Sequence, residues 1–390
     1  MRERSRRIAI LTGGGDVPGL NAAIRSFVIH ANDAGVDVIG LRRGWEALVR
    51  IVPEQGADNS RWIIPLDAAN TRTIDRSGGT FLHTTRMNPS RARLAQVPPH
   101  LTAVAGNQDG DGRFDLTPHA LRTIEFLGIE GIVVIGGDGT LAFARRLDAE
   151  GVPLVAIPKT LDNDVFGTDY CIGFSTAITR SVAFINDLRT AAGSHERLVV
   201  VELFGRYSGE TCLLTAYLAS TDRAAIAEVP FDVEKLYALM EQDRADNPSG
   251  YAILAISEGA RPSDGGYFER GQPDVNGNRR LGGVGEYVSD YFERRSGERV
   301  IYQRLAYLMR SGAPDSLDQL VAKNYGRLAA ELIARRDTGR MVALADGRYA
   351  SVGIQITGRQ RKLVDVNRSY DSEQFRPKEG NVLGMPMFHP

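Results

Sequence analysis

The sequence predicts an α/β protein that contains two sheets. Short apolar segments rich in β-branched residues alternate with longer segments of helical periodicity along most of the 390 residues. This alternation is typical of βαβ units and of parallel sheets. A chain of this length can hold two or three domains, and its 43% hydrophobic content is sufficient for a packed core.

The alternation divides into two series of elements. In the first series we expect strands at residues 8–11, 36–41, 131–135 and 153–157, and helices at 20–31 and 141–147. In the second we expect strands at 197–202 and 251–257, and helices at 175–191, 209–220, 284–295 and 316–336. Residues 87–118, 262–283 and the end of the chain from 358 are polar and contain Pro or Gly, and they indicate insertions or a tail.

Charge and composition exclude several classes of partner. The 47 Lys and Arg residues balance 48 Asp and Glu residues, so no global charge favours nucleic acid or an acidic membrane. No run of apolar residues is long enough to span a bilayer, and the charged N-terminus lacks the apolar region of a secretory signal. Cys171 and Cys212 are far apart and are expected to be reduced core thiols. We therefore expect a cytoplasmic protein that binds neither nucleic acid nor membrane.

Glycine-rich loops follow two of the predicted strands. The first is G-G-G-D-V-P-G (13–19), and the second is G-G-D-G-T (136–140). In a parallel sheet such loops share one edge, where backbone N–H groups and helix N-termini favour phosphate. The first loop is neither a dinucleotide fingerprint nor a P-loop, since no Lys-Ser/Thr pair follows it. Asp138 places one carboxylate inside the second loop, as a Mg²⁺–nucleotide site requires, although a turn residue explains it as well.

A third loop, P-K-T-L-D-N-D (158–164), follows the strand at 153–157 and carries two aspartates. Phosphoryl transfer needs an acceptor to be positioned, its proton to be taken and charge to be neutralised. Asp162 as base, with Asp164 nearby as a metal or water ligand, satisfies these needs. An Asx-turn or a helix cap accounts for either aspartate alone, but it leaves Lys159 and Thr160 unexplained.

Taken together, these segments resemble the phosphofructokinase family over most of the chain. The matching segments occur in the family's order: T-G-G-G-D-V-P-G-L-N-A-A-I-R (12–25), G-G-T-F-L-H-T-T-R (78–86), G-G-D-G-T (136–140), P-K-T-L-D-N-D (158–164), S-H-E-R (194–197), F-G-R (204–206), S-E-G (257–259) and R-S-G-A-P-D-S-L-D (310–318). The resemblance implies two Rossmann-like three-layer αβα domains with mainly parallel sheets and the active site in the cleft between them. It places a donor-binding domain at residues 1–174 plus about 311–350, a fructose 6-phosphate-binding domain at about 175–310, and a C-terminal extension at 351–390.

The resemblance also implies an activity, namely phosphorylation of fructose 6-phosphate to fructose 1,6-bisphosphate with ATP or pyrophosphate and Mg²⁺. The catalytic residues it implies are Thr160, Asp162 as base, Asp164 and Arg206. The donor-binding residues it implies are Gly15, Arg86, Gly137, Asp138, Gly139, Thr140 and Lys159, with Asp138 as the metal ligand. The substrate-binding residues it implies are Thr160, Asp162, Arg197, Phe204, Gly205, Arg206, Glu258, Arg299, Tyr307 and Arg310.

Some arginines that clamp the 6-phosphate in this family come from a neighbouring subunit. The resemblance therefore implies a homodimer or homotetramer with shared active sites.

The sequence departs from the usual pattern of the family at several positions. Phe204 replaces a more usual Met, and Tyr307 stands where many bacterial ATP enzymes have His. Ile29 and residues 247–250 lack the basic groups of the usual effector site, so we expect weak allosteric control.

Two positions bear on the phosphoryl donor. Gly139 leaves room for the α-phosphate of a nucleotide, whereas typical pyrophosphate enzymes carry Asp there. Lys159 is typical of pyrophosphate enzymes, and many ATP enzymes carry Gly. Because an obstructing carboxylate excludes ATP directly and a lysine does not, we expect ATP as donor, with pyrophosphate as the alternative.

Other functions are compatible with parts of the pattern. A kinase for sedoheptulose 7-phosphate is the nearest, and the arginine set favours a sugar phosphate over a nucleoside. The chain could also be a nucleotide-binding regulatory homologue that has lost activity. The presence of Asp138, Asp162 and Asp164 argues against this function. Lipid and NAD kinases also contain G-G-D-G-T. Assignment to either class would leave the segments 158–164 and 310–318 unexplained.

Overall fold

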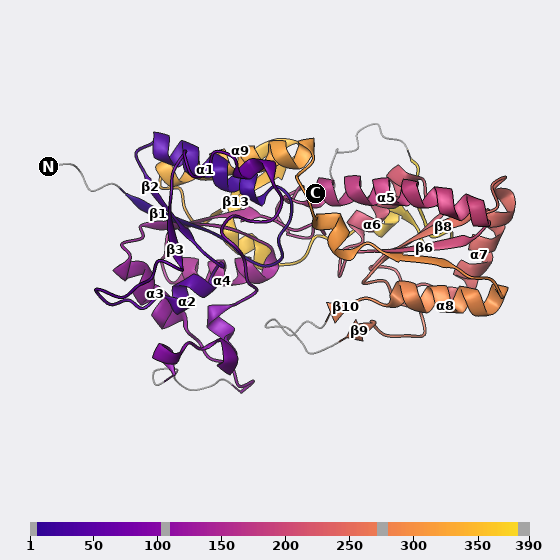
Figure 1. Ribbon diagram of the computed structural model, residues 1–390, viewed down its shortest axis with the longest axis horizontal. Helices are drawn as coiled ribbons and strands as arrows, with labels where there is room; N and C mark the ends of the chain where they lie inside the picture. The colour runs from indigo at the N-terminus through magenta and orange to yellow at the C-terminus, as the bar shows by residue number, and fades with distance from the viewer. Residues whose placement is uncertain (1–5, 103–109, 271–279, 381–390) are drawn as a thin grey trace.

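The computed structural model describes residues 6–102, 110–270 and 280–380. Two sheets organise these residues side by side along the long axis of the molecule (Figure 1). The predicted α/β class with mainly parallel sheets is confirmed.

The first sheet has seven strands in the order β13-β12-β5-β4-β1-β2-β3. Five of them are mutually parallel: β1 (Arg7–Thr12), β2 (Asp37–Leu41), β4 (Gly131–Gly136), β5 (Leu154–Pro158) and β12 (Arg340–Ala345). The antiparallel strands β3 (Ile63–Leu66) and β13 (Arg348–Gly353) form its two edges. Since β1, β4 and β5 run in one direction, the three loops predicted to carry chemistry leave the same edge of the sheet.

Helices cover both faces of the first sheet. Ile8 and Ile10 of β1 pack toward α1 (Leu20–Asp33) and α9 (Ser316–Ala334), while Ala9 and Leu11 face the opposite side. On that side lie α2 (Glu46–Arg50), α3 (Thr117–Phe126) and α4 (Asp138–Ala149). The alternation of buried side chains along one strand thus produces three layers.

The second sheet has four parallel strands in the order β11-β6-β8-β7: β11 (Ile301–Arg304), β6 (Leu198–Leu203), β8 (Ala252–Ser257) and β7 (Arg223–Ala225). Figure 1 shows α5 (Phe174–His195) and α6 (Glu210–Ala219) above this sheet and α8 (Val284–Ser296) below it, with α7 (Val233–Asp246) at the outer end. A short antiparallel pair, β9 (Glu269–Arg270) and β10 (Arg280–Leu281), lies beneath.

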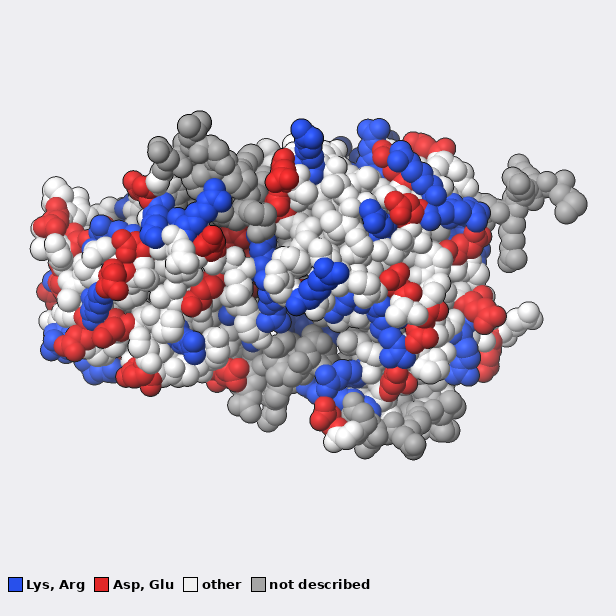
Figure 2. All heavy atoms as spheres, turned by 180° about the vertical axis from the view of Figure 1, so that it is seen from behind, with Lys and Arg blue, Asp and Glu red and all other residues white. Residues whose placement is uncertain are grey.

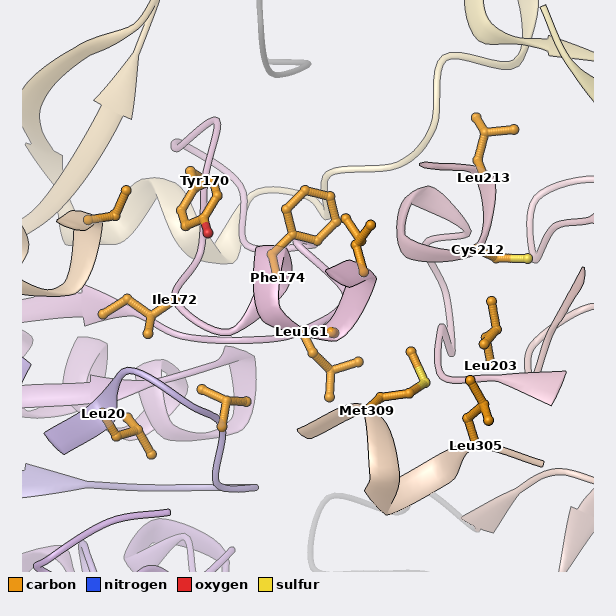
Figure 3. Packing of buried hydrophobic residues seen from close by; sticks show 14 of the residues in the cluster. Leu20, Leu161, Tyr170, Ile172, Phe174, Leu203, Cys212, Leu213, Leu305 and Met309 are labelled. Atoms are coloured by element: carbon orange, nitrogen blue, oxygen red, sulfur yellow. The ribbon is translucent and has the colours of Figure 1, made fainter. Parts of the chain in front are cut away.

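The hydrophobic core is continuous between the two sheets. Leu161 of the third loop lies between Phe174 at the start of α5 and Met309, as Figure 3 shows. Leu203 and Leu305 continue the same cluster into the second sheet. The catalytic segment predicted from the sequence is therefore anchored in the shared core by the leucine that precedes Asp162.

The end of the chain joins the two sheets from outside. After β13, residues 354–380, which we call the C-terminal strap, include α10 (Val366–Ser369), β14 (Tyr370–Asp371) and β15 (Arg376–Pro377). The strap passes from the first sheet to the edge strand β7 of the second, where Ala224 N–H donates to the carbonyl of Phe375 at 2.7 Å. The predicted tail is thus an ordered part of the fold up to residue 380.

The strands of the first sheet come from residues 7–158 and 340–353, and those of the second from 198–304. The division into domains at 1–174 plus 311–350, 175–310 and 351–390 remains a prediction. Cys171 and Cys212 are buried and free, which agrees with the expected reduced thiols. In the described part of the chain, no helix combines the length and the apolar character needed to cross a bilayer.

Candidate active site

The candidate active site lies where the carboxyl ends of the strands of both sheets meet. The Asp162 loop follows β5 of the first sheet, and Phe204–Arg206 and Glu258 follow β6 and β8 of the second. The backbone N–H of Arg206 lies 3.5 Å from Oδ2 of Asp162, so the two edges touch at this aspartate. Seen from behind, basic side chains gather at the waist between the two halves of the molecule (Figure 2).

Asn163 shapes the loop that carries the two aspartates. It adopts a left-handed conformation with φ 54°, which asparagine tolerates better than most residues. Its buried amide donates to the carbonyl of Asp169 at 3.0 Å and to Glu210 at 3.2 Å, and its Oδ1 accepts from Cys171 N–H at 2.8 Å. Because Asn163 points into the protein, Asp162 and Asp164 on either side are left half-buried at the cleft.

Four carboxylates lie close together at this point. Burial and then the neighbouring Glu258 carboxylate raise the pKa of Asp162 to about 7. Burial, followed by the charges of Asp162 and Asp138, raises the pKa of Asp164 to about 8. A carboxyl group whose pKa lies near neutrality is suited to accept a proton from a substrate at physiological pH.

The crowding of negative charge also fits a divalent cation. Asp138 begins α4, is about one-third exposed, and is close enough to Asp164 to raise its pKa. Mg²⁺ typically takes one or two protein carboxylates and completes its shell with water and substrate phosphates. Asp138 and Asp164 supply two such carboxylates. Within the described ranges, no group of three His, Cys, Asp or Glu side chains is arranged to hold a metal ion.

The predicted donor loops converge beside these carboxylates. Lys159 is buried, and its Nζ donates to the carbonyl of Gly15 at 2.7 Å. Burial, then the charges of Arg310 and Arg86, lower the pKa of Lys159 to about 8. A Cβ atom at position 15 would lie 2.7 Å from the guanidinium of Arg310, so this arginine lies directly against the Gly15 backbone. Gly137, Gly139 and Thr140 lie at the start of α4, next to Asp138.

A separate group of residues lines the second half of the site. Phe204 and Tyr307 are in edge-to-face contact with ring centroids 6.3 Å apart, and the Arg310 guanidinium lies 4.5 Å from the Tyr307 ring. Arg310 also lies 3.3 Å from Asp16, and among the described residues its buried Nε has no hydrogen-bond partner. Gly205 has φ 139° and packs against Ser257, which excludes any larger residue.

Two predicted substrate residues lie away from this site. Arg197 precedes β6 and Arg299 precedes β11, so both stand at the amino ends of the second sheet. The six residues of β6 separate Arg197 from Phe204, a length of about 20 Å. The chain therefore does not bring these arginines to its own Asp162.

Comparison with known proteins identifies the family. Residues 7–333 match the family model described as phosphofructokinase. The chain belongs to the phosphofructokinase family. The family assignment inferred from the sequence is confirmed.

Two relatives in this family differ in the donor that they are named for. The chain is 35% identical to the ATP-dependent 6-phosphofructokinase of Chloroflexus aggregans, over 88% of each chain. It is also 35% identical to the pyrophosphate–fructose 6-phosphate 1-phosphotransferase of Streptomyces coelicolor, over 92% of this chain and 96% of the relative. The percentage identity is therefore the same for these two relatives, although they are named for different donors.

A solved structure supports the fold. The phosphofructokinase of Saccharomyces cerevisiae matches with a TM-score of 0.70 at 22% identity. The match covers 90% of this chain but 45% of the yeast chain. At this identity the likeness shows the phosphofructokinase fold.

Two arginines near this candidate site, Arg304 and Arg361, were not predicted from the sequence. Arg304 ends β11 and pairs with Glu202 at 2.9 Å and with Glu258 at 3.5 Å. No strand was predicted at residues 301–304, so no local signal marked Arg304 as a residue of the site. Arg361 in the C-terminal strap pairs with Asp138 at 3.1 Å and stacks on Tyr207. The strap lies beyond the residues that match the family model, and its sequence gave no local signal of a site.

Proposed function

We propose that this chain transfers a phosphoryl group from ATP·Mg to the 1-hydroxyl of fructose 6-phosphate. The observation that carries the proposal is Asp162, a half-buried carboxyl with a pKa of about 7 between the donor loops and the substrate loop. Its relatives of both donor types are named for fructose 6-phosphate as acceptor or for 6-phosphofructokinase activity, which supports this sugar phosphate over sedoheptulose 7-phosphate.

In this mechanism Asp162 accepts the proton of the 1-hydroxyl as the hydroxyl oxygen attacks the terminal phosphorus. A new O–P bond forms, the bond from the bridging oxygen to that phosphorus breaks, and the shortened donor leaves with the electron pair. Asp138, with Asp164 nearby, would hold Mg²⁺, which neutralises charge on the donor phosphates. Arg206 is placed beside Asp162 to stabilise the transferred group, and Thr160 holds the loop by accepting from Asp162 N–H at 3.1 Å.

On the donor side, Gly15, Arg86, Lys159 and the N-terminus of α4 present positive charge and backbone N–H groups to the phosphates. On the sugar side, Glu258 accepts from a hydroxyl group, and Phe204, Tyr307 and Arg310 surround the 6-phosphate end. We assign Arg197 and Arg299 to the 6-phosphate of a neighbouring subunit's site, because they lie far from Asp162 in their own chain. This assignment requires a homodimer or homotetramer.

Pyrophosphate as donor is the second candidate, and one observation favours it. Lys159 is buried against the donor loop through its contact with Gly15, where an ammonium group can hold a short donor. Gly139 favours ATP instead, because it leaves space for the α-phosphate of a nucleotide.

A coupled assay with fructose 6-phosphate decides between the donors. Purified protein should turn over faster with ATP·Mg than with pyrophosphate·Mg at equal free Mg²⁺. Equal or faster turnover with pyrophosphate would overturn the ATP assignment. Absence of turnover with both donors, in a protein that melts cooperatively, would overturn the proposed function.

A further inference from the structure

The C-terminal strap is attached directly to the catalytic loop. Arg361 forms an antiparallel bridge with Val165, and the backbone N–H of Lys362 donates to the carbonyl of Asp164 at 3.1 Å. Lys362 is only 4% exposed, and its Nζ donates to the carbonyl of Asp169 at 2.9 Å. The backbone at position 361 is therefore fixed beside Asp164 by a buried neighbour.

Arg361 itself points into the site. Its Nε lies 3.1 Å from Oδ2 of Asp138, and its guanidinium carbon lies 3.8 Å from the centre of the Tyr207 ring. The side chain remains 42% exposed. Stacking on an aromatic ring favours one plane of a guanidinium group, so Arg361 presents its guanidinium to the carboxylate assigned to Mg²⁺.

The ion pair with Asp138 does little for stability. Pairs with this degree of exposure contribute about 0–1 kcal/mol in measured cases. Lys362 in contrast is buried against Glu210 at 3.5 Å and accounts for the attachment of the strap. The position of Arg361 therefore requires a reason other than holding the strap in place.

We propose that Arg361 is a residue of the phosphoryl-donor site: it pairs with Asp138 when no donor is bound, and it would bind the donor's terminal phosphate when the Asp138 carboxylate holds Mg²⁺. This inference rests on the proposed function, because it assumes a phosphate donor at Asp138. It assigns a binding role to a segment outside residues 7–333, which match the family model.

The exchange of partners follows from charge. A cation that binds Asp138 removes the partner of Arg361 and brings phosphate oxygens into the same space. Guanidinium groups form strong charge-assisted hydrogen bonds with phosphate. Because Lys362 fixes the backbone, a rotation of the Arg361 side chain is sufficient, and no movement of the strap is needed.

Two binding measurements with opposite expected signs test the inference. The variant is Arg361→Gln, and the control is Arg359→Gln, which changes an exposed arginine of the same strap. Mn²⁺ alone, titrated by its electron paramagnetic resonance signal, should bind the Arg361→Gln protein about 3–10-fold more tightly, since Asp138 loses a competing cation. A non-hydrolysable ATP analogue and pyrophosphate, each with Mn²⁺, should bind it about 10–100-fold more weakly, since a charged hydrogen bond is lost.

Three further comparisons separate a binding role from a structural one. Arg361→Lys should recover part of the donor affinity, and added guanidinium ion should partly restore donor binding to Arg361→Ala. The melting temperature of Arg361→Gln should equal that of Arg359→Gln. Equal loss of Mn²⁺ and donor affinity, or a fall in melting temperature that accounts for the loss, would overturn the inference, and so would unchanged affinity for both.

The outcome is independent of turnover. If Arg361→Gln shows the opposite shifts in Mn²⁺ and donor affinity, but the wild-type protein does not phosphorylate fructose 6-phosphate, the donor-site role of Arg361 stands and the proposed function fails. If it phosphorylates the sugar while Arg361→Gln binds metal and donors normally, the proposed function stands and this inference fails.

Discussion

Lys159 Nζ donates a hydrogen bond of 2.7 Å to the carbonyl oxygen of Gly15. The contact joins the segment that carries Asp162 and Asp164 to the glycine loop after β1. Burial, with Arg310 and Arg86 nearby, lowers the pKa of this lysine to about 8, so most of the ammonium form persists at neutral pH. Lys159 thus holds the loop at Gly15 in position and places a positive charge next to it.

Replacement of Lys159 should affect the two donors unequally. We expect Lys159→Gly to reduce kcat/KM for pyrophosphate more than kcat/KM for ATP, because the short donor has fewer other groups to hold it. The ratio of the two kcat/KM values measures the effect directly. As control, Lys323→Gly changes a lysine that pairs with Asp75 and should leave the ratio unchanged. A larger loss with ATP would contradict the role of Lys159 in holding a short donor.

The second prediction concerns Asp162. Asp162→Ser should lower kcat by about 10²–10⁴-fold with a modest change in KM for fructose 6-phosphate, because a general base acts mainly in the transition state. Steady-state kinetics with ATP·Mg measure both constants. A near-normal kcat would remove Asp162 from the role of base.

The activity should also depend on pH through Asp162. A base must be deprotonated, and the pKa of this carboxyl is raised to about 7, so kcat/KM should fall on the acid side of about pH 7 and level off above it. Glu258→Gln removes a negative charge that raises the pKa of Asp162, and it should therefore move the midpoint of the profile to lower pH. A profile that is flat from pH 5 to pH 8 would be inconsistent with Asp162 as the titrating base.

The sequence predicted the parts of the site whose signals are local. Gly and Asp in short loops after apolar strands indicated the Gly15, Asp138 and Asp162 segments, and the elements around them form close to the expected residues. Arg361 could not be predicted as a site residue, because 223 positions separate it from Asp138 in the sequence and its segment has no helical or strand periodicity. The short strand β7 and the edge strand β3 were missed for a similar reason, since only pairing with a neighbour defines them.

The fourth prediction concerns the connection between α9 and α5. Asp318 is fully buried and accepts hydrogen bonds from the Tyr170 hydroxyl at 2.8 Å, from Gly173 N–H at 2.7 Å, and from Thr176 N–H at 2.8 Å. Asp318→Ala leaves these buried donors unpaired and should lower the free energy of unfolding by about 3–5 kcal/mol. Chemical denaturation measures the loss, and Asp337→Ala, at an exposed aspartate, should stay within about 0.5 kcal/mol of wild type. A loss below about 1 kcal/mol would show that the network does not hold the two helices together.

The last prediction concerns sharing of the active site between subunits. Arg197 stands about 20 Å from Phe204 of its own chain, at the other end of β6, so a 6-phosphate bound near Phe204 must find its Arg197 on another subunit. Arg197→Ala and Asp162→Ser should each inactivate the homo-oligomer. Co-expression of the two variants in equal amounts should restore about a quarter of the wild-type activity in a dimer, because half of the dimers are mixed and one site in each is intact.

Differently tagged subunits allow the mixed dimers to be isolated and assayed alone, where about half of the wild-type activity is expected. Co-expression of Asp162→Ser with Arg206→Ala is the matched control. Both of these residues belong to one chain's site, and a mixed dimer therefore contains no intact site. Recovery in this control, or no recovery with Arg197→Ala, would place Arg197 outside a shared site.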